Sequence, residues 1–162
     1  MSVSTPPTYL YILSDALGVV AANTFLSLFN PANSGKSITV TQVDVAIYGV
    51  GVTIAQNSLL RKRITAASSG TLIAASTVAR FRTSHADPVF EVRINNPTVT
   101  TSALAHGAHA PVVSTKEGLN AASYSVVPNP LMVYRPGEGV AFSTALGNIN
   151  QTWTISIVWQ EK

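Results

Sequence analysis

Hydrophobic and polar residues alternate with a period of two along much of this chain, which is the spacing of side chains on a β-strand. The clearest case is residues 151–161 (QTWTISIVWQE), where Trp153, Ile155, Ile157 and Trp159 share one face and small, mostly polar residues share the other. The apolar face predicts a central strand whose tryptophans pack in a core rather than stack on a sugar. The polar face is typical of a sheet surface that meets solvent or a partner.

Comparable segments recur along the chain, separated by turn residues about every 8–12 positions, as in β-sandwiches and barrels. They are residues 8–13, 23–30, 36–49, 58–67, 70–83, 88–95, 121–128, 130–137 and 138–146. Within residues 36–49 the apolar phase shifts by one position near Thr41 and Gln42, which predicts a β-bulge. Ser68, Ser69 and Gly70 predict a turn between two of the strands.

Three stretches are less regular. Residues 14–23 (SDALGVVAAN) are the best candidate for a helix, but Gly18 and two valines weaken it, and we expect a mainly irregular segment. Residues 73–81 (IAASTVARF) are compatible with a short helix as well as with a strand. Residues 95–117, rich in Thr, Ala, His and Pro, are expected to form long loops, which often carry function.

The pattern therefore predicts a single all-β domain, a β-sandwich or barrel with jelly-roll-like topology. The Pro6-Pro7 pair favours extended backbone, and the residues around it offer little to anchor a core. We expect an extended N-terminal arm over residues 1–13 and a β-sandwich body over residues 14–162.

The composition suggests a surface that is polar but largely neutral, rich in Ser, Thr and Asn, and that is partly covered by other subunits. Hydrophobic residues make up 46% of the chain and charged residues only 10%, against about 25% charged residues in typical soluble domains. No apolar stretch is long enough to span a bilayer, and the start lacks the basic region of a signal peptide. The chain has no cysteine, so it forms neither disulfides nor thiolate metal sites.

The net charge of +3 is a small excess, and its densest cluster is Arg61-Lys62-Arg63. These side chains alternate between the two faces of an expected strand, so they do not form the basic face of a nucleic-acid binder. Gly35-Lys36-Ser37 resembles the end of a phosphate-binding loop. However, Asn30 replaces the first glycine of that motif and a strand pattern follows, so we expect a turn and no nucleotide site.

Histidines are the residues most suggestive of chemistry. His106 and His109, with His85 and Asp87 upstream, could supply zinc ligands, but a His-x-x-His spacing outside a helix fixes no geometry. Solvated loop histidines, or a pH-sensitive cluster at a subunit contact, are the alternatives. No Gly-x-Ser-x-Gly motif and no distinct carboxylate pair is present. We therefore expect a protein without enzymatic activity, metal or cofactor.

Several segments resemble capsid decoration (cement) proteins of tailed bacteriophages: residues 25–40 (FLSLFNPANSGKSITV), 63–71 (RITAASSGT), 134–142 (YRPGEGVAF) and the Trp-bearing last strand. The resemblance covers residues 23–162. It implies a homotrimer on the outer surface of the virion capsid, assembled in the host cytoplasm, that bridges neighbouring major capsid proteins. In such proteins an N-terminal arm often reaches between subunits, so Pro6, Pro7, Tyr9 and Tyr11 are the expected partner contacts.

Two alternatives belong to other classes. A trimeric spike or tail-associated jelly roll would bind host glycans, most plausibly through the loops of residues 95–117. An enzyme, such as a hydrolase, would use the region of His85, His106 and His109.

Overall fold

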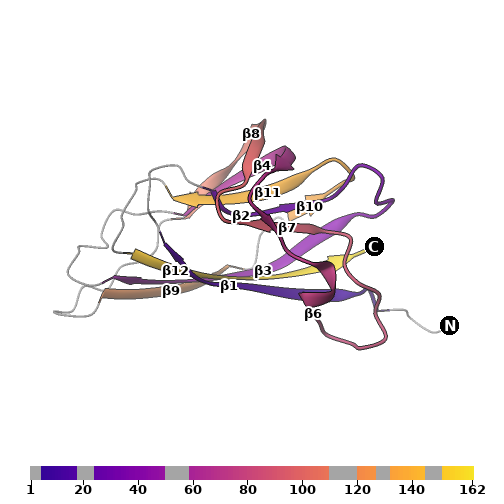
Figure 1. The fold of residues 1–162 in the computed structure, drawn as a ribbon, viewed down its shortest axis with the longest axis horizontal. Helices are drawn as coiled ribbons and strands as arrows, with labels where there is room; N and C mark the ends of the chain where they lie inside the picture. The colour runs from indigo at the N-terminus through magenta and orange to yellow at the C-terminus, as the bar shows by residue number, and fades with distance from the viewer. Residues whose placement is uncertain (1–4, 18–23, 50–58, 110–119, 127–131, 145–150) are drawn as a thin grey trace.

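The computed structural model describes residues 5–17, 24–49, 59–109, 120–126, 132–144 and 151–162. These residues form two antiparallel sheets packed face to face (Figure 1), which confirms the predicted all-β sandwich. Sheet A contains β1 (Thr8–Leu17), β3 (Ile38–Gly49), β6 (Ala79–Arg80), β9 (Asn120–Val126), β10 (Met132–Tyr134) and β12 (Gln151–Glu161). Sheet B contains β2 (Thr24–Phe29), β4 (Leu59–Ser68), β5 (Thr71–Leu72), β7 (Glu91–Ile94), β8 (Thr98–His109) and β11 (Gly139–Thr144).

The order of the strands in the two sheets is that of a jelly roll. In sheet A, β1 is followed by β12 and β3, and β3 then pairs with both β9 and β10. In sheet B, the order β2-β11-β4-β8 runs across the central strands. Most strands that follow one another in the sequence therefore lie in opposite sheets, as in the double-sheet jelly rolls.

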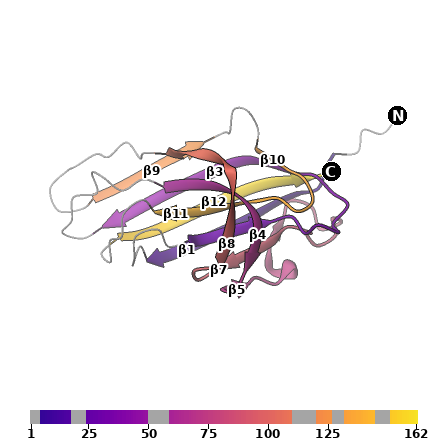
Figure 2. The same ribbon diagram turned by 90° about the horizontal axis from the view of Figure 1, so that it is seen from above.

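Residues between β4 and β8 form an insertion that closes one side of the sandwich. β7 extends sheet B beside β2, while β6 extends sheet A beside β1. Figure 2 shows β5 and β7 on one side of the molecule and β9 on the other. Val78 and Phe90 of the insertion are buried in the core. Residues 73–81, for which the sequence allowed a helix, contain a single 3-10 turn, η1 (Ala75–Thr77), followed by β6.

The core is organised around β12, which lies between β1 and β3 as a central strand, as predicted. Trp153 and Trp159 are both fully buried. The Trp159 ring stacks on Tyr9 and meets Phe90 edge-on, each with ring centroids 5.7 Å apart. This geometry is favourable for aromatic pairs and confirms that the tryptophans are core residues.

Two local predictions from the sequence are confirmed. Val158 pairs with Gln42 and Trp159 with Val40, so Thr41 is the extra residue of a β-bulge. Ser69 and Gly70, with φ of 52° and 62°, form the turn between β4 and β5. A Cβ atom at Gly70 would lie 2.5 Å from the Ile94 carbonyl oxygen, so this turn requires glycine for space as well as for its backbone conformation.

The expected boundary between an arm over residues 1–13 and a body over residues 14–162 is wrong. β1 begins at Thr8 and pairs with β12 from Gln160 onwards. Tyr9 is fully buried and Leu13 is 8% exposed, so both side chains belong to the core. An extended backbone after Pro6-Pro7 fits a strand as well as an arm, and the apolar contacts of Tyr9 and Leu13 place this segment in the sandwich.

The prediction of long loops over residues 95–117 is wrong for residues 98–109, which form β8 on the edge of sheet B. The remainder, residues 110–117, lies outside the described part of the chain. Of the segment expected to be irregular, residues 14–17 continue β1 beyond an irregular register between Leu13 and Ala16, and residues 18–23 are not described.

Candidate functional site

The Gly35-Lys36-Ser37 tripeptide is a structural turn. Gly35 has a φ of 66°, and β3 rather than a helix begins at Ile38. The Asn30 side-chain amide donates to the Lys36 carbonyl oxygen at 2.8 Å, and Lys36 Nζ lies 3.3 Å from the Glu161 carboxylate. Lys36 is therefore engaged by a carboxylate of its own chain, as expected of a turn and not of a phosphate-binding loop.

The structure does not bring the candidate histidines into a described metal site. His85 lies in the loop after β6, and its backbone N–H donates to the Arg82 carbonyl oxygen. Asp87 pairs with Arg80 at 3.0 Å. His106 and His109 lie in β8, within a stretch whose side chains are outside the described part. Among the described residues, no group of three or more potential ligands converges.

The four expected partner contacts at the N-terminus separate into two groups. Tyr9 is a core residue, and its hydroxyl donates to the Ala86 carbonyl oxygen at 3.0 Å. Pro6, Pro7 and Tyr11 are half-buried. Tyr11 packs against the core, and burial raises the pKa of its hydroxyl. Contact of Pro6, Pro7 and Tyr11 with a partner stays a prediction, whereas Tyr9 has no surface to offer.

The outer face of sheet A is the surface that the structure singles out. Along β12 the positions that alternate with the core residues are half-buried: Thr152, Thr154, Ser156, Val158 and Gln160. On one side of them lie Leu10 and Ile12 of β1, and on the other lie Gln42 and Asp44 of β3. We call these outward positions of β1, β3, β10 and β12, together with Phe81 at the β6 edge, the sheet A face.

Most of the exposed large hydrophobic side chains lie on this face, at separate positions. In the described part of the chain four large hydrophobic residues are exposed: Ile12 (53%), Leu72 (50%), Phe81 (61%) and Val133 (44%). Ile12 is on β1, Val133 lies beside Thr39 at the β10 edge, and Phe81 donates its N–H to the Thr8 carbonyl oxygen at the opposite edge. Only Leu72 belongs to sheet B. From β6 to β10 the face is about 19 Å wide, at about 4.8 Å per strand.

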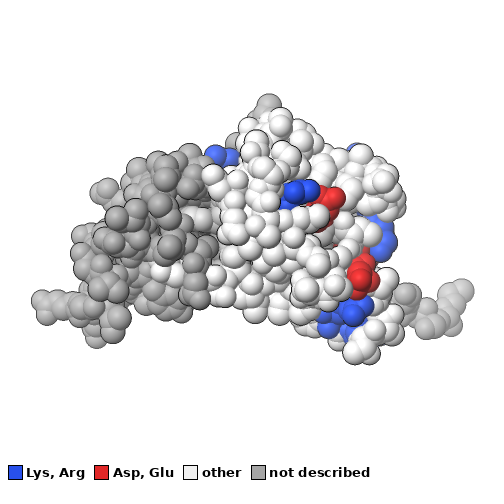
Figure 3. Space-filling model, in the orientation of Figure 1, with Lys and Arg blue, Asp and Glu red and all other residues white. Residues whose placement is uncertain are grey.

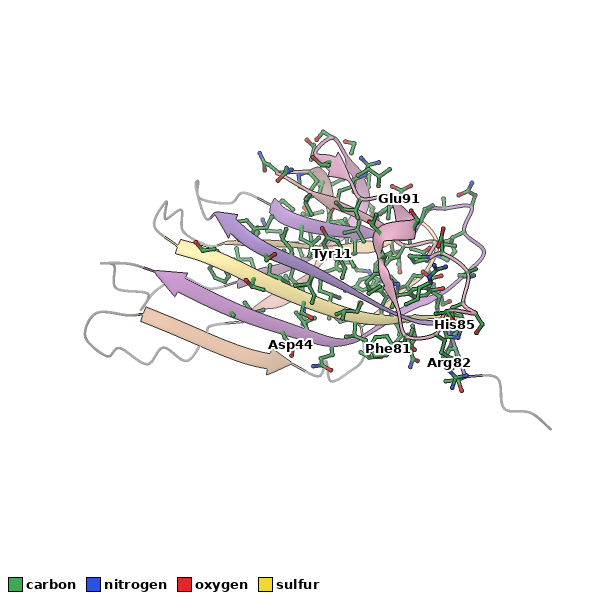
Figure 4. The ribbon with its side chains drawn as sticks, turned by 60° about the horizontal axis from the view of Figure 1, so that its bottom comes forward. Tyr11, Asp44, Phe81, Arg82, His85 and Glu91 are labelled. Carbon is green, nitrogen blue, oxygen red and sulfur yellow. The ribbon has the colours of Figure 1, made fainter. Side chains whose placement is uncertain are left out.

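The sheet A face also carries little charge. Asp44 is the one charged residue among the outward positions of β1, β3, β10 and β12 whose side chains are described. The Gln42 amide donates to both of its carboxylate oxygens, at 3.0 and 2.9 Å. Figure 4 shows Asp44 on this side of the molecule, with Phe81, Arg82 and His85 together at one end. In the view of Figure 3 most of the described surface is likewise uncharged.

The outer face of sheet B differs, because its central strands are covered. Ser27 of β2 and Ala141 and Ser143 of β11 are fully buried. Their cross-strand neighbours include the long side chains of Arg93 and Lys62. Sheet A therefore presents the more open and weakly charged outer surface of this sandwich.

Phe81 is the member of this face that sequence analysis missed. It follows a strand of two residues and lies between Arg80 and Arg82, so no alternation marked it as exposed or buried.

Arg61, Lys62 and Arg63 lie in β4, as expected of a strand rather than of a basic patch. Arg63 stacks over the Tyr134 ring, 5.6 Å from its centroid, and forms an ion pair with Glu138. Burial raises the pKa of the Glu138 carboxyl, but the hydrogen bond from the Arg135 N–H and the contact with Arg63 outweigh it, so the pKa is lowered. This cluster joins β4 of sheet B to β10 of sheet A.

Because the folded pKa of Glu138 is lowered, its contribution to stability is present above the unfolded value near 4.5 and is lost as the pH falls through the folded pKa. Glu138→Gln should reduce the free energy of unfolding at pH 7 by about 1 kcal/mol. The difference between the variant and the wild type should shrink below pH 4.5. Urea unfolding across the pH range measures it, and a difference that grows with acid would contradict the assignment.

Among the described residues, none belongs to a helix with the length and hydropathy needed to cross a membrane. Comparisons with protein-family models, curated proteins and solved structures give no match.

Proposed function

We propose that this chain is a non-enzymatic structural protein that decorates the outside of a tailed-bacteriophage head. It acts as a trimer and stabilises the shell by bridging major capsid proteins. The resemblance of its turn and strand segments supports the capsid as the target. The observation that carries a contact function is the sheet A face, a surface with little charge that exposes Ile12, Phe81 and Val133 at separate positions.

The mechanism of such a protein is selective binding. A ligand that binds the assembled, expanded shell and not its free subunits shifts the equilibrium towards the shell. A trimer that contacts several capsid subunits at once adds avidity, so modest individual contacts suffice. A broad and preformed sheet surface suits this role, because it loses little conformational entropy on binding.

Purified protein added to expanded heads that lack it should co-sediment with them and raise their heat stability. At a concentration about 100 times the dissociation constant, each site gains about 2.7 kcal/mol. Calorimetry of the heads with and without the protein measures the effect. Heads whose heat stability and protein composition do not change would refute the proposal. Binding of the protein on a glycan array would favour the spike alternative. Zinc bound to the purified protein would favour the enzyme alternative.

The sheet A face is tested separately by a pair of matched variants. Ile12→Thr removes an exposed hydrophobic side chain from the face, and Leu72→Thr removes one from sheet B. We expect the first variant to bind heads about tenfold more weakly, a loss of about 1.4 kcal/mol, and the second to bind like the wild type. Equal binding by both would place the contact elsewhere.

A further inference from the structure

Phe81 is the most exposed of the large hydrophobic side chains in the described part of the chain, yet the backbone around it is firmly held. Its N–H donates to the Thr8 carbonyl oxygen at 3.1 Å. Arg80 Nη1 donates to the His85 carbonyl oxygen at 3.1 Å and to the Asp87 carboxylate at 3.0 Å. These contacts join the start of the loop after β6 to β1, and they join Arg80 before the loop to His85 and Asp87 at its other end.

A hydrogen bond from a core residue also holds this loop. Tyr9, itself fully buried, donates its hydroxyl to the Ala86 carbonyl oxygen at 3.0 Å. Burial, followed by the charge of Glu161, raises the pKa of this hydroxyl, so it stays a neutral donor. A ring that is exposed on a preorganised loop loses little freedom when it binds, which is the character of an interface anchor.

The charges around Phe81 are unbalanced. Arg80 is paired with Asp87, but within the described residues Arg82 has no carboxylate partner and is exposed. Lys162 is also exposed, beyond the end of β12 that pairs with Thr8. Asp44 lies away from this end of the molecule (Figure 4). Arg82 is therefore a cation beside Phe81 that no described carboxylate neutralises.

We infer that Phe81 is the anchor of the sheet A face: its ring enters an apolar pocket on the major capsid protein, and Arg82 pairs with a carboxylate at the rim of that pocket. The inference rests on the proposed function and names the chemistry of the partner surface. The capsid as occupant follows from the proposed function, and the unpaired Arg82 cation complements an acidic rim, whereas a face-to-face pairing of two copies would bring like charges together. The apolar ring supplies affinity, and the guanidinium supplies orientation and rate of association.

The Phe81→Ala variant should bind expanded heads at least about 30-fold more weakly than the wild type, as expected for an anchor residue. Leu72→Ala is the matched control, because Leu72 is similarly exposed but lies on sheet B. It should bind within about twofold of the wild type. Both free variants should unfold at the wild-type temperature, since neither side chain is in the core.

The role of the Arg82 charge is tested by a substitution that removes it. Arg82→Gln should bind heads about three- to tenfold more weakly and should flatten the dependence of the association rate on salt. Arg135→Gln makes the same charge change at an exposed position in the turn after β10 and should leave both quantities unchanged.

The outcomes separate the two proposals. Wild-type protein that does not bind heads overturns the proposed function, and with it the capsid pocket. Wild type that binds, with Phe81→Ala binding equally well, overturns the anchor alone. A Phe81→Ala variant that binds heads normally but no longer self-associates in size-exclusion chromatography overturns the capsid pocket in favour of a second copy as the occupant.

Discussion

Removing residues 1–13 is expected to abolish folding of this sandwich. The deletion takes away Tyr9 and Leu13, which are buried in the core, and removes the pairing of β12 from Ile155 to Gln160 on one side. Losing one large buried side chain costs about 2–5 kcal/mol, and the total stability of a domain is about 5–15 kcal/mol. Far-UV circular dichroism and urea unfolding of the truncated chain should show no cooperative transition.

The matched control is a deletion of residues 1–5, of which the structure describes only the exposed Thr5. This variant keeps Pro7, whose carbonyl oxygen accepts the Glu161 N–H at 3.1 Å, and should unfold at the same urea concentration as the full chain. Its binding to heads tests the predicted contribution of the N-terminus to partner contact. A deletion of residues 1–13 that unfolds like the full chain would show that β1 adds nothing to the core.

Local alternation in the sequence was enough to place β12 and its bulged neighbour β3. Trp153 is two residues from Ile155, and Trp159 is two residues from Ile157, which is the spacing of side chains on one face of a strand. Their burial therefore follows from spacing alone. The one-residue shift at Thr41 marked the bulge for the same reason. By contrast, β8 has a Thr- and Ala-rich sequence, and its register with β4 shifts at several points, so no period of two survives to be read.

The surface features depended on the path of the chain, which local patterns do not contain. Tyr9 follows two prolines and alternates with Tyr11, a pattern that fits an extended arm as well as a strand; only its position over Trp159 makes it a core residue. Phe81 is exposed because it follows β6 at the edge of sheet A, where the insertion between β4 and β8 turns before β7 joins sheet B. The low charge of the surface could therefore be predicted from the sequence, but the positions of its exposed hydrophobic residues could not.

Glu161 illustrates the same limit within the core. A glutamate one residue from the end of the chain has the sequence context of a solvated tail, yet its side chain is fully buried. The segments that surround it are far apart in the sequence. Its Oε1 accepts the backbone N–H groups of Val89 and Phe90, at 2.9 and 3.2 Å, and the Trp159 indole N–H at 3.3 Å. Its Oε2 faces Lys36 Nζ at 3.3 Å.

Glu161→Ala should reduce the free energy of unfolding by about 3–5 kcal/mol. The loss arises because three N–H donors are left without their acceptor, and an unpaired buried donor costs about 1–3 kcal/mol. The Lys36 side chain is 34% exposed, so solvent replaces most of its contact with the carboxylate. Glu161→Gln retains a carbonyl oxygen as acceptor and should lose less. The midpoint of urea unfolding measures each effect.

The control for this prediction is Glu91→Ala, which makes the same substitution in a different setting. Glu91 pairs with Arg93 at 3.3 Å, but its side chain is 35% exposed, so solvent replaces the lost contact. The expected loss is below about 1 kcal/mol. If the two alanine variants unfolded at the same urea concentration, the hydrogen bonds to the Glu161 carboxylate would contribute no more than a surface ion pair. The joining of the turn before β3, the start of β7 and the end of β12 would then have to rest on apolar packing and on the two backbone hydrogen bonds between Ser37 and Lys162.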